Sequence, residues 1–133
     1  MRILIDECLP AQLKDMLVGH HEAETVSDRG WSGLRNGDLL SHASRDYDAF
    51  LTADQGIPFQ QNLSGFHLAV VIVPTNRLKH LRYAVPLLIR SLENLHKREI
   101  AVMDLPGEPE SWPKLQLNRI EREGRTARHL FGV

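Results

Sequence analysis

The sequence predicts an α/β fold in which helices cover both faces of a central, mostly parallel sheet of about 4–5 strands. Short runs of branched aliphatic residues alternate along the chain with segments whose apolar residues recur at helical spacing. Two of the aliphatic runs are followed directly by an aspartate. The 133 residues suffice for one domain with a proper core and are too few for two ordinary ones.

The first third of the chain holds two predicted strands and one helix. Residues 3–5 are consecutive branched aliphatics and predict a buried strand. Pro10 suits the first turn of a helix, and Gly19 is expected to end that helix. Residues 21–26 predict a second, weaker strand.

The middle of the chain repeats the alternation. We expect Asn36 to cap a second helix, followed by strands at residues 49–54 and 68–73. A leucine-rich helical stripe then starts near residue 76, and Pro86 predicts a kink in it or a division into two helices. Residues 99–103 predict the last strand, so the domain is expected to span residues 1–103.

The C-terminal part, residues 104–133, is expected to be a proline-containing linker and a basic tail. Residues 104–113 contain three prolines and a glycine, which predicts a linker. The last twenty residues carry more basic than acidic side chains, which is typical of a solvated helix face or a mobile tail. RNA binding is the alternative for the arginines of this tail, Arg119, Arg122, Arg125 and Arg128.

Composition narrows the class of protein. Hydrophobic residues make up 42% and charged residues 25%, as in soluble globular proteins. Cys8 is the single cysteine, so an intramolecular disulfide is excluded, and no apolar stretch approaches the roughly 18 residues of a membrane span. We therefore expect a cytoplasmic protein without a membrane partner. The net charge of −1 means that a nucleic-acid site would have to be a local patch.

Three aspartates are placed to meet at one edge of the predicted sheet. Asp6 follows the first strand, Asp54 ends the third, and Asp38 lies in the first turn of the helix that leads to the third. Functional groups of parallel sheets gather beyond the carboxyl ends of the strands. Carboxylates brought together repel unless a cation stabilises their charged forms. The pattern therefore predicts a Mg²⁺ or Mn²⁺ site, where the ion polarises a phosphoryl oxygen and activates a water.

Each residue also has a structural interpretation. Asp6 could cap the following helix, Asp38 could merely complement its helix dipole, and Asp54 could begin a turn in ADQG. Glu7 is expected to be exposed or to support a ligand, and Thr52 to hydrogen-bond a carboxylate or the substrate.

Five further side chains are expected to have structural roles. His20 and His21 match no zinc spacing and are expected at the surface. Cys8 is expected to be a small buried thiol, and Trp31, like Trp112, a packing residue.

Four blocks of the chain, RILIDECLP, GWSGLRNGDLL, FLTADQGIPFQQNLSG and VIVPTNRL, resemble in order and spacing the DUF5615 family of PIN-like bacterial proteins. The resemblance covers about residues 1–103. It implies a three-layer α/β/α, Rossmann-like PIN fold and a metal-dependent endoribonuclease activity. It also implies the toxin component of a toxin–antitoxin pair with a small DUF433-type partner, and PIN-like toxins often form homodimers.

Carried over by position, the resemblance makes Asp6 the first-strand acid, Asp54 the acid of the T-x-D motif, and Asp38 a helix acid that is often Glu in relatives. The three would be both metal ligands and catalytic residues. The side chains expected to support them or contact the substrate are Glu7, Thr52, Gln55, Gln60, Gln61 and Asn62.

Departures from the family pattern leave two other functions open. Gly56 stands where many relatives carry a further Asp, Gln55 where Arg is common, and Asp38 is shorter than the usual Glu. Fewer acids favour a catalytically degenerate module that binds RNA or protein. A receiver-like phospho-acceptor domain would also place an acid at Asp54, but Asp104 follows the last predicted strand where such domains need a lysine.

Overall fold

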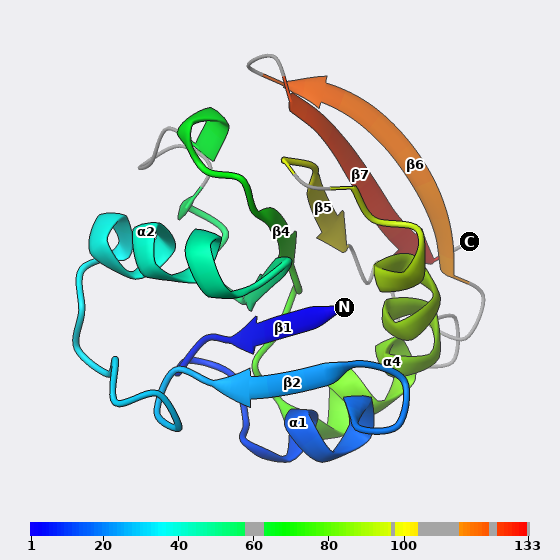
Figure 1. The fold of residues 1–133 in the computed structure, drawn as a ribbon. Coiled ribbons are helices and arrows are strands. Elements are labelled where there is room, and N and C mark those ends of the chain that lie inside the picture. Colours follow the sequence, from blue (N-terminus) through cyan, green and yellow to red (C-terminus); the bar gives the residue numbers. More distant parts are fainter. Residues whose placement is uncertain (58–62, 97, 104–114, 123–124, 133) are drawn as a thin grey trace.

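The computed structural model describes residues 1–57, 63–96, 98–103, 115–122 and 125–132. Within these ranges the chain forms one sheet of seven strands in the order β2-β1-β3-β4-β5-β7-β6 (Figure 1). The strands are β1 (Arg2–Ile5), β2 (Glu22–Thr25), β3 (Ala49–Thr52), β4 (Ala69–Ile72), β5 (Ile100–Met103), β6 (Leu115–Arg122) and β7 (Arg125–Gly132). The helices are α1 (Gln12–Leu17), α2 (Asn36–Asp46), the 3₁₀ helix η1 (Leu63–Gly65) and α4 (Leu78–Glu93).

The first five strands are all parallel, which confirms the predicted fold class. Every residue of β3 and β4 is buried, as expected of parallel strands that are covered on both faces. The aliphatic runs of the sequence therefore mark the centre of the sheet.

Helices lie on both faces of the sheet and produce a three-layer α/β/α, Rossmann-like arrangement (Figure 1). Alternate residues of β1 point to opposite faces. Ile3 and Ile5 belong to the buried cluster that includes α1 and α4, whereas Leu4 belongs to the cluster that includes α2. The helix residues that complete the first cluster include Leu13, Leu17, Leu81, Ala84, Leu88 and Leu92.

The predicted end of α1 agrees with the structure, whereas the predicted starts of α1 and α2 do not: Pro10 precedes α1, which begins at Gln12 with Ala11 as its N-cap. Gly19 follows α1 with a φ of 97°, a left-handed conformation that ends a helix without strain. The prediction that Asn36 caps α2 is wrong, because Asn36 is the first helical residue and Arg35 is the N-cap. Arg35 has extended backbone angles, its carbonyl accepts from the Leu39 N–H at 2.9 Å, and no side chain caps the helix.

The predicted division at Pro86 does not occur: α4 is one helix, with Pro86 in its interior. A proline within a helix leaves the carbonyl four residues earlier, here that of Arg82, without its N–H donor. Arg82 and Pro86 are both exposed, so this carbonyl lies on the side of α4 that faces water. Apolar residues on the opposite side hold the helix against the sheet.

The C-terminal residues also differ from their prediction. Residues 115–122 and 125–132 form β6 and β7, not a helix face or a tail, whereas the predicted linker at residues 104–113 lies outside the described residues. β7 pairs in parallel with β5, and β6 pairs antiparallel with β7. Apolar and polar residues alternate in LQLN, which is typical of a strand. The pairing with β7 provides hydrogen-bond partners for the backbone groups at the open edge of β5. The sheet thus continues beyond residue 103.

None of the helices in the described ranges combines the length and the apolar character that a membrane crossing requires.

The position of Pro86 makes a prediction about stability. A proline in a helix interior costs about 3 kcal/mol, of which its rigid ring recovers about 1 kcal/mol through the unfolded chain. Pro86→Ala should therefore raise the free energy of unfolding in urea by about 2 kcal/mol. Arg90→Ala, on the same exposed side of α4, is the control and should change it by less than about 0.5 kcal/mol. An unchanged midpoint for Pro86→Ala would show that α4 accommodates the proline without cost.

Candidate functional site

The candidate site lies where β1 and β3 end side by side. The two strands are parallel neighbours, and the Asp6 N–H extends the pairing by donating to the Leu51 carbonyl at 2.9 Å. After β1 the chain enters α1 on one face of the sheet, whereas after β3 it passes Ile57 and Leu63, which pack in the cluster on the other face. In α/β sheets, ligands commonly bind in a crevice at the carboxyl ends of two strands between which the chain reverses in this way, and we call this position the crevice.

A single hydroxyl connects the two predicted acids. Thr52 is fully buried, and its Oγ1 donates to Asp6 Oδ2 at 2.7 Å. The same oxygen accepts from the backbone N–H of Asp54 at 3.0 Å. This geometry confirms the expectation that Thr52 hydrogen-bonds a carboxylate, and it keeps Asp6 and Asp54 at the same edge of the sheet.

The remaining contacts of Asp6 are also local. Oδ1 accepts from the backbone N–H of Glu7 at 2.8 Å, and Oδ2 accepts from the Cys8 thiol at 3.5 Å. Asp6 does not cap the following helix, because Ala11 is the N-cap of α1 and no side chain caps it. Of the two interpretations of this acid, the structural one as a helix cap is therefore excluded.

Asp54 forms the turn that its sequence context predicts. Its Oδ1 accepts from the backbone N–H of Gly56 at 2.9 Å, and its carbonyl accepts from Ile57 at 3.3 Å. The side chain of Gln55 donates from Nε2 to the Val73 carbonyl at 2.7 Å and so links this turn to the end of β4. Gln55 thus has a structural contact next to the site.

The other predicted site residues lie further out. Glu7 is exposed, and its Oε1 accepts from the Gly33 N–H at 3.3 Å, which fastens the loop before α2 to the end of β1. Asp38 is exposed in the first turn of α2, and among the contacts of the described residues none joins it to Asp6 or Asp54. Gln60, Gln61 and Asn62 lie outside the described residues.

Asp38 nevertheless lies at the same edge of the sheet. α2 ends at the opposite edge, where the Asp46 carbonyl accepts from Arg2 Nη1 at 2.7 Å, at the start of β1. The first turn of α2 therefore points to the carboxyl ends of the strands.

The donor set suits one mode of metal binding. Within the described residues, no group of three or more His, Cys, Asp or Glu side chains is arranged to hold a metal ion. Mg²⁺, however, is usually held by one or two protein carboxylates together with waters and substrate phosphates. Asp6 and Asp54 are hard oxygen donors in that number and would hold such an ion together with waters, not as a complete protein cage.

Cys8 departs from its prediction, because it is exposed and not a buried core thiol. Its Sγ nevertheless lies against the site, 3.5 Å from Asp6 Oδ2 and 3.8 Å from Thr52 Oγ1. Partial desolvation of the sulfur raises the pKa of the Cys8 thiol, and the negative charge of Asp6 raises it further. The thiol is thus a protonated donor to Asp6 at neutral pH, a role that no sequence pattern indicates.

The prediction that His21 lies at the surface is also wrong. It is buried under α4, and its Nε2 lies 3.3 Å from the Ile89 carbonyl. Trp31, in contrast, packs as predicted, stacked on His42 with ring centroids 5.3 Å apart and with the Arg29 guanidinium 4.3 Å from its ring centroid. Trp112 lies outside the described residues.

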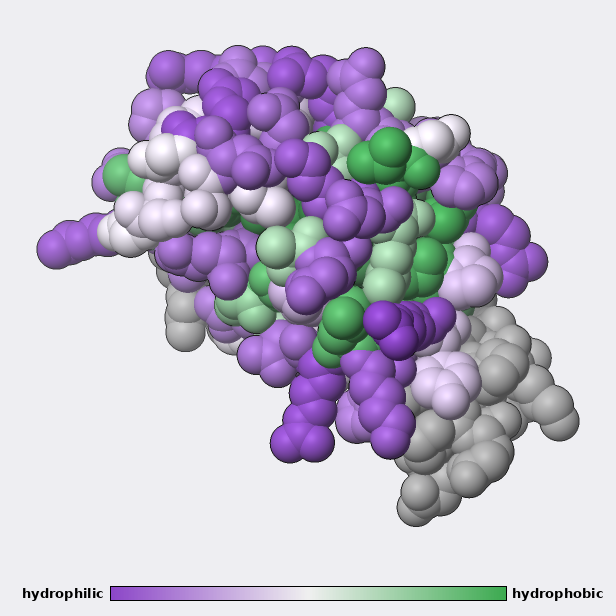
Figure 2. Space-filling model, turned by 90° about the horizontal axis from the view of Figure 1, so that it is seen from below, coloured by the Kyte–Doolittle hydropathy of each residue, from purple (hydrophilic) through white to green (hydrophobic). Residues whose placement is uncertain are grey.

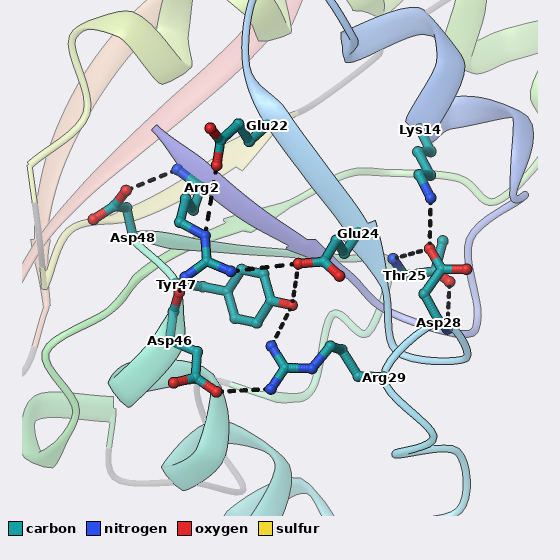
Figure 3. Close-up of polar contacts among 10 residues, drawn as sticks. All are labelled: Arg2, Lys14, Glu22, Glu24, Thr25, Asp28, Arg29, Asp46, Tyr47 and Asp48. Carbon is teal, nitrogen blue, oxygen red and sulfur yellow. Dashed lines mark hydrogen bonds and ion pairs between the residues drawn. The ribbon is translucent and has the colours of Figure 1, made fainter.

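A second polar cluster lies around β2 and the C-terminal end of α2 (Figure 3). At its centre the buried Tyr47 hydroxyl donates to Glu24 Oε1 at 2.9 Å and accepts from Arg29 Nη1 at 2.8 Å. Arg29 also bonds Asp46 at 2.9 Å, and Arg2 lies 3.4 Å from Glu24. Each cation in this cluster faces a carboxylate.

A smaller pair in the same view joins α1 to the loop after β2 (Figure 3). Lys14 Nζ bonds Asp28 at 2.8 Å, and this hydrogen bond is the main reason that the pKa of Asp28 falls to about 2. Asp28 therefore stays ionised at neutral pH. In this pair and in the cluster around Tyr47, the positive and negative charges neutralise one another. We therefore assign these residues a structural role and not a role in ligand binding.

No family model, curated protein or solved structure matches this chain. The interpretation of the site therefore depends on its geometry.

The Thr52 bridge predicts a stability difference between two substitutions. Thr52→Val keeps the shape of the side chain but leaves Asp6 Oδ2 and the Asp54 N–H without this partner, so the free energy of unfolding should fall by about 1–3 kcal/mol. Thr52→Ser is the control, because it keeps the hydroxyl and loses one methyl group, worth about 1 kcal/mol. The two variants should also differ in the amide chemical shift of Asp54, which only Thr52→Val should move strongly. Equal stability of Thr52→Val and the unmodified protein would contradict the bridge.

The raised pKa of Cys8 predicts slow alkylation. The thiolate is the form that reacts with iodoacetamide, and at a given pH less of it is present in the folded protein than in the urea-unfolded chain. The pH at which the reaction rate is half-maximal should therefore be higher for the folded protein. Asp6→Asn removes a neighbouring negative charge and should move that midpoint to lower pH. Asp15→Asn, an exposed change on α1, should leave it in place. A folded midpoint at or below the unfolded one would refute this environment for Cys8.

Proposed function

We propose that this protein is a Mg²⁺- or Mn²⁺-dependent endoribonuclease of the PIN-like type. The observation that carries the proposal is the Thr52 hydroxyl, which donates to the Asp6 carboxylate and accepts from the Asp54 backbone N–H at the ends of neighbouring parallel strands. Asp6 and Asp54 would hold the ion, and Asp38 would contribute a third carboxylate from the first turn of α2. Both the acid positions and the blocks shared with DUF5615 proteins support this interpretation.

The residues of the site have distinct roles in the proposed reaction. When bound, the ion would supply Lewis acidity toward a phosphoryl oxygen and lower the pKa of a water. Thr52 and the Glu7 N–H fix the orientation of the Asp6 carboxylate, so its oxygens need no reorganisation when charge develops. The thiol of Cys8 donates to the same carboxylate and stays neutral, so it adds no negative charge beside a phosphodiester.

The biological setting is proposed from the resemblance. DUF5615-type proteins are associated with small DUF433-type antitoxins, so we propose that this chain is a cytoplasmic toxin that such a partner neutralises. We further propose homodimer formation, as in many PIN-like toxins. The arginines of β6 and β7, Arg119, Arg122, Arg125 and Arg128, would add to RNA binding.

A specific observation favours a second candidate function, a catalytically degenerate module that binds RNA or protein. Gly56 stands where many relatives carry another acid, and its N–H is used to close the turn at Asp54. With two carboxylates in the crevice and Asp38 outside it, metal affinity would be weak. RNA affinity without cleavage would identify this second function.

The nuclease proposal makes a direct prediction. Substitution of a residue that supports a metal ligand commonly lowers activity by about 10–100-fold. Asp6→Asn and Asp54→Asn each remove a proposed ligand itself, so each should slow Mn²⁺-dependent RNA cleavage by more than about 100-fold. Asp15→Asn is the matched control, because it neutralises an exposed carboxylate on α1 without touching the crevice. Circular dichroism should show that all three variants are folded. Cleavage that survives excess EDTA, or that Asp6→Asn leaves intact, would refute the proposal.

A further inference from the structure

One side of α4 presents positive charge to solvent. Its members recur at helical spacing along one side of the helix, opposite the buried residues that face the sheet. All of them are exposed, and Tyr83 in their middle is 43% exposed. We call this set the α4 basic face: Lys79, Arg82, Tyr83, Pro86 and Arg90.

The charge of this face is not balanced as it is elsewhere on the molecule. The ion pairs of the described residues involve Arg2, Lys14 and Arg29, and none of the α4 cations. The sequence of α4 contains one acid, Glu93, which lies in the last turn near Arg90. The positive potential is therefore strongest in the first half of the helix, where the helix dipole adds to it. A chain with a net charge of −1 thus concentrates cations on one helix.

The α4 basic face begins beside the candidate site. The Val73 N–H, at the end of β4, donates to the Thr52 carbonyl at 2.8 Å, and the Val73 carbonyl accepts from Gln55. Arg77, four residues later, is the N-cap of α4 and is also exposed. From Lys79 to Arg90 the face extends about 16 Å at 1.5 Å per residue.

The surface around α1 and α4 is visible in the space-filling view (Figure 2). Hydrophilic side chains project from this surface, and a smaller group of hydrophobic ones lies among them (Figure 2). Long charged side chains that project in this way can contact a polymer lying across the surface.

We propose that the α4 basic face binds the phosphodiester backbone of single-stranded RNA that enters the site, and that Tyr83 stacks on one of its bases. Cations in a row neutralise phosphates without reading sequence, and an aromatic ring among them offers a face to any base. This inference takes the identity of the polymer from the proposed function. A second copy of the chain fits the surface poorly, because two α4 basic faces would repel.

Fluorescence anisotropy of a labelled single-stranded RNA tests the inference, with the full chain in EDTA so that the RNA is not cut. Each phosphate contact that is lost should reduce the slope of log affinity against log salt by about 0.7. Lys79→Gln/Arg82→Gln should therefore flatten the slope by about 1.4 and weaken binding at low salt by tenfold or more. Arg82→Gln should cost more than Arg90→Gln, because Glu93 already offsets the charge of Arg90.

Two controls separate charge from folding. Arg45→Gln removes an exposed cation from α2 on the other face of the sheet and should leave the slope unchanged. Lys79→Arg/Arg82→Lys keeps both charges and should bind like the unmodified chain. For the aromatic contact, Tyr83→Phe should retain affinity, and Tyr83→Leu should lose it several-fold.

The outcomes distinguish this inference from the function on which it depends. If the unmodified chain binds RNA and Lys79→Gln/Arg82→Gln binds it equally well, the inference is overturned and the nuclease proposal is untouched. If the unmodified chain neither binds nor cleaves RNA, both fail. Binding of poly-glutamate tests an acidic protein as the alternative partner. If Lys79→Gln/Arg82→Gln loses affinity for poly-glutamate and keeps its affinity for RNA, the α4 basic face binds an acidic protein, and the RNA assignment is wrong.

Discussion

The hydroxyl of Thr52 donates to Asp6 and accepts from the backbone of Asp54, and this arrangement requires that β1 and β3 be parallel neighbours. Because both strands end at the same edge, Asp6 and Thr52, 46 positions apart, are joined through one buried hydroxyl. The chain leaves the two strands toward opposite faces of the sheet, which is the topology at which α/β sheets commonly bind ligands. The candidate site is therefore a consequence of the order of the strands, and the loops supply only the local contacts that orient its side chains.

Charge is distributed on the molecule in three ways. The cluster around Tyr47 pairs every cation with a carboxylate. Its exposed ion pairs, those of Arg2 with Glu22 and Glu24, contribute little, about 0–1 kcal/mol each. At the crevice the two carboxylates accept from a hydroxyl, a thiol and backbone N–H groups, and no ion pair among the described residues involves either of them. Among the described residues, Lys79, Arg82 and Arg90 of α4 take part in no ion pair, and Glu93 is the one acid of this helix. The carboxylates of the crevice and the start of the α4 basic face thus lie toward the same edge of the sheet, a distribution that the proposed metal ion and polyanion would require.

Much of the fold was predictable because buried segments require apolar residues, and these are recognisable in the sequence. Strands covered on both faces need unbroken apolar runs, and β3 and β4 have them. The errors arose where local signals compete with tertiary packing. Pro86 is tolerated because the Arg82 carbonyl, which it leaves without an N–H donor, lies on the exposed side of α4. β6 and β7 form because β5 offers an open edge to segments whose charges suggested a tail. Neither circumstance is visible in a window of a few residues.

The site was predictable only in part. That Asp6 and Asp54 share an edge follows from the parallel topology, but the thiol contact of Cys8 and the burial of His21 depend on side-chain packing.

The central claim is that Asp6 and Asp54 form a shared cation site at the ends of β1 and β3. Titration of isotopically labelled protein with Mn²⁺, followed by paramagnetic broadening of amide signals, tests it most directly. The amides of Asp6, Glu7, Asp54 and Gly56 should broaden first, and Asp6→Asn should abolish the effect. Broadening centred on Glu22 and Glu24, or none at millimolar Mn²⁺, would contradict the claim.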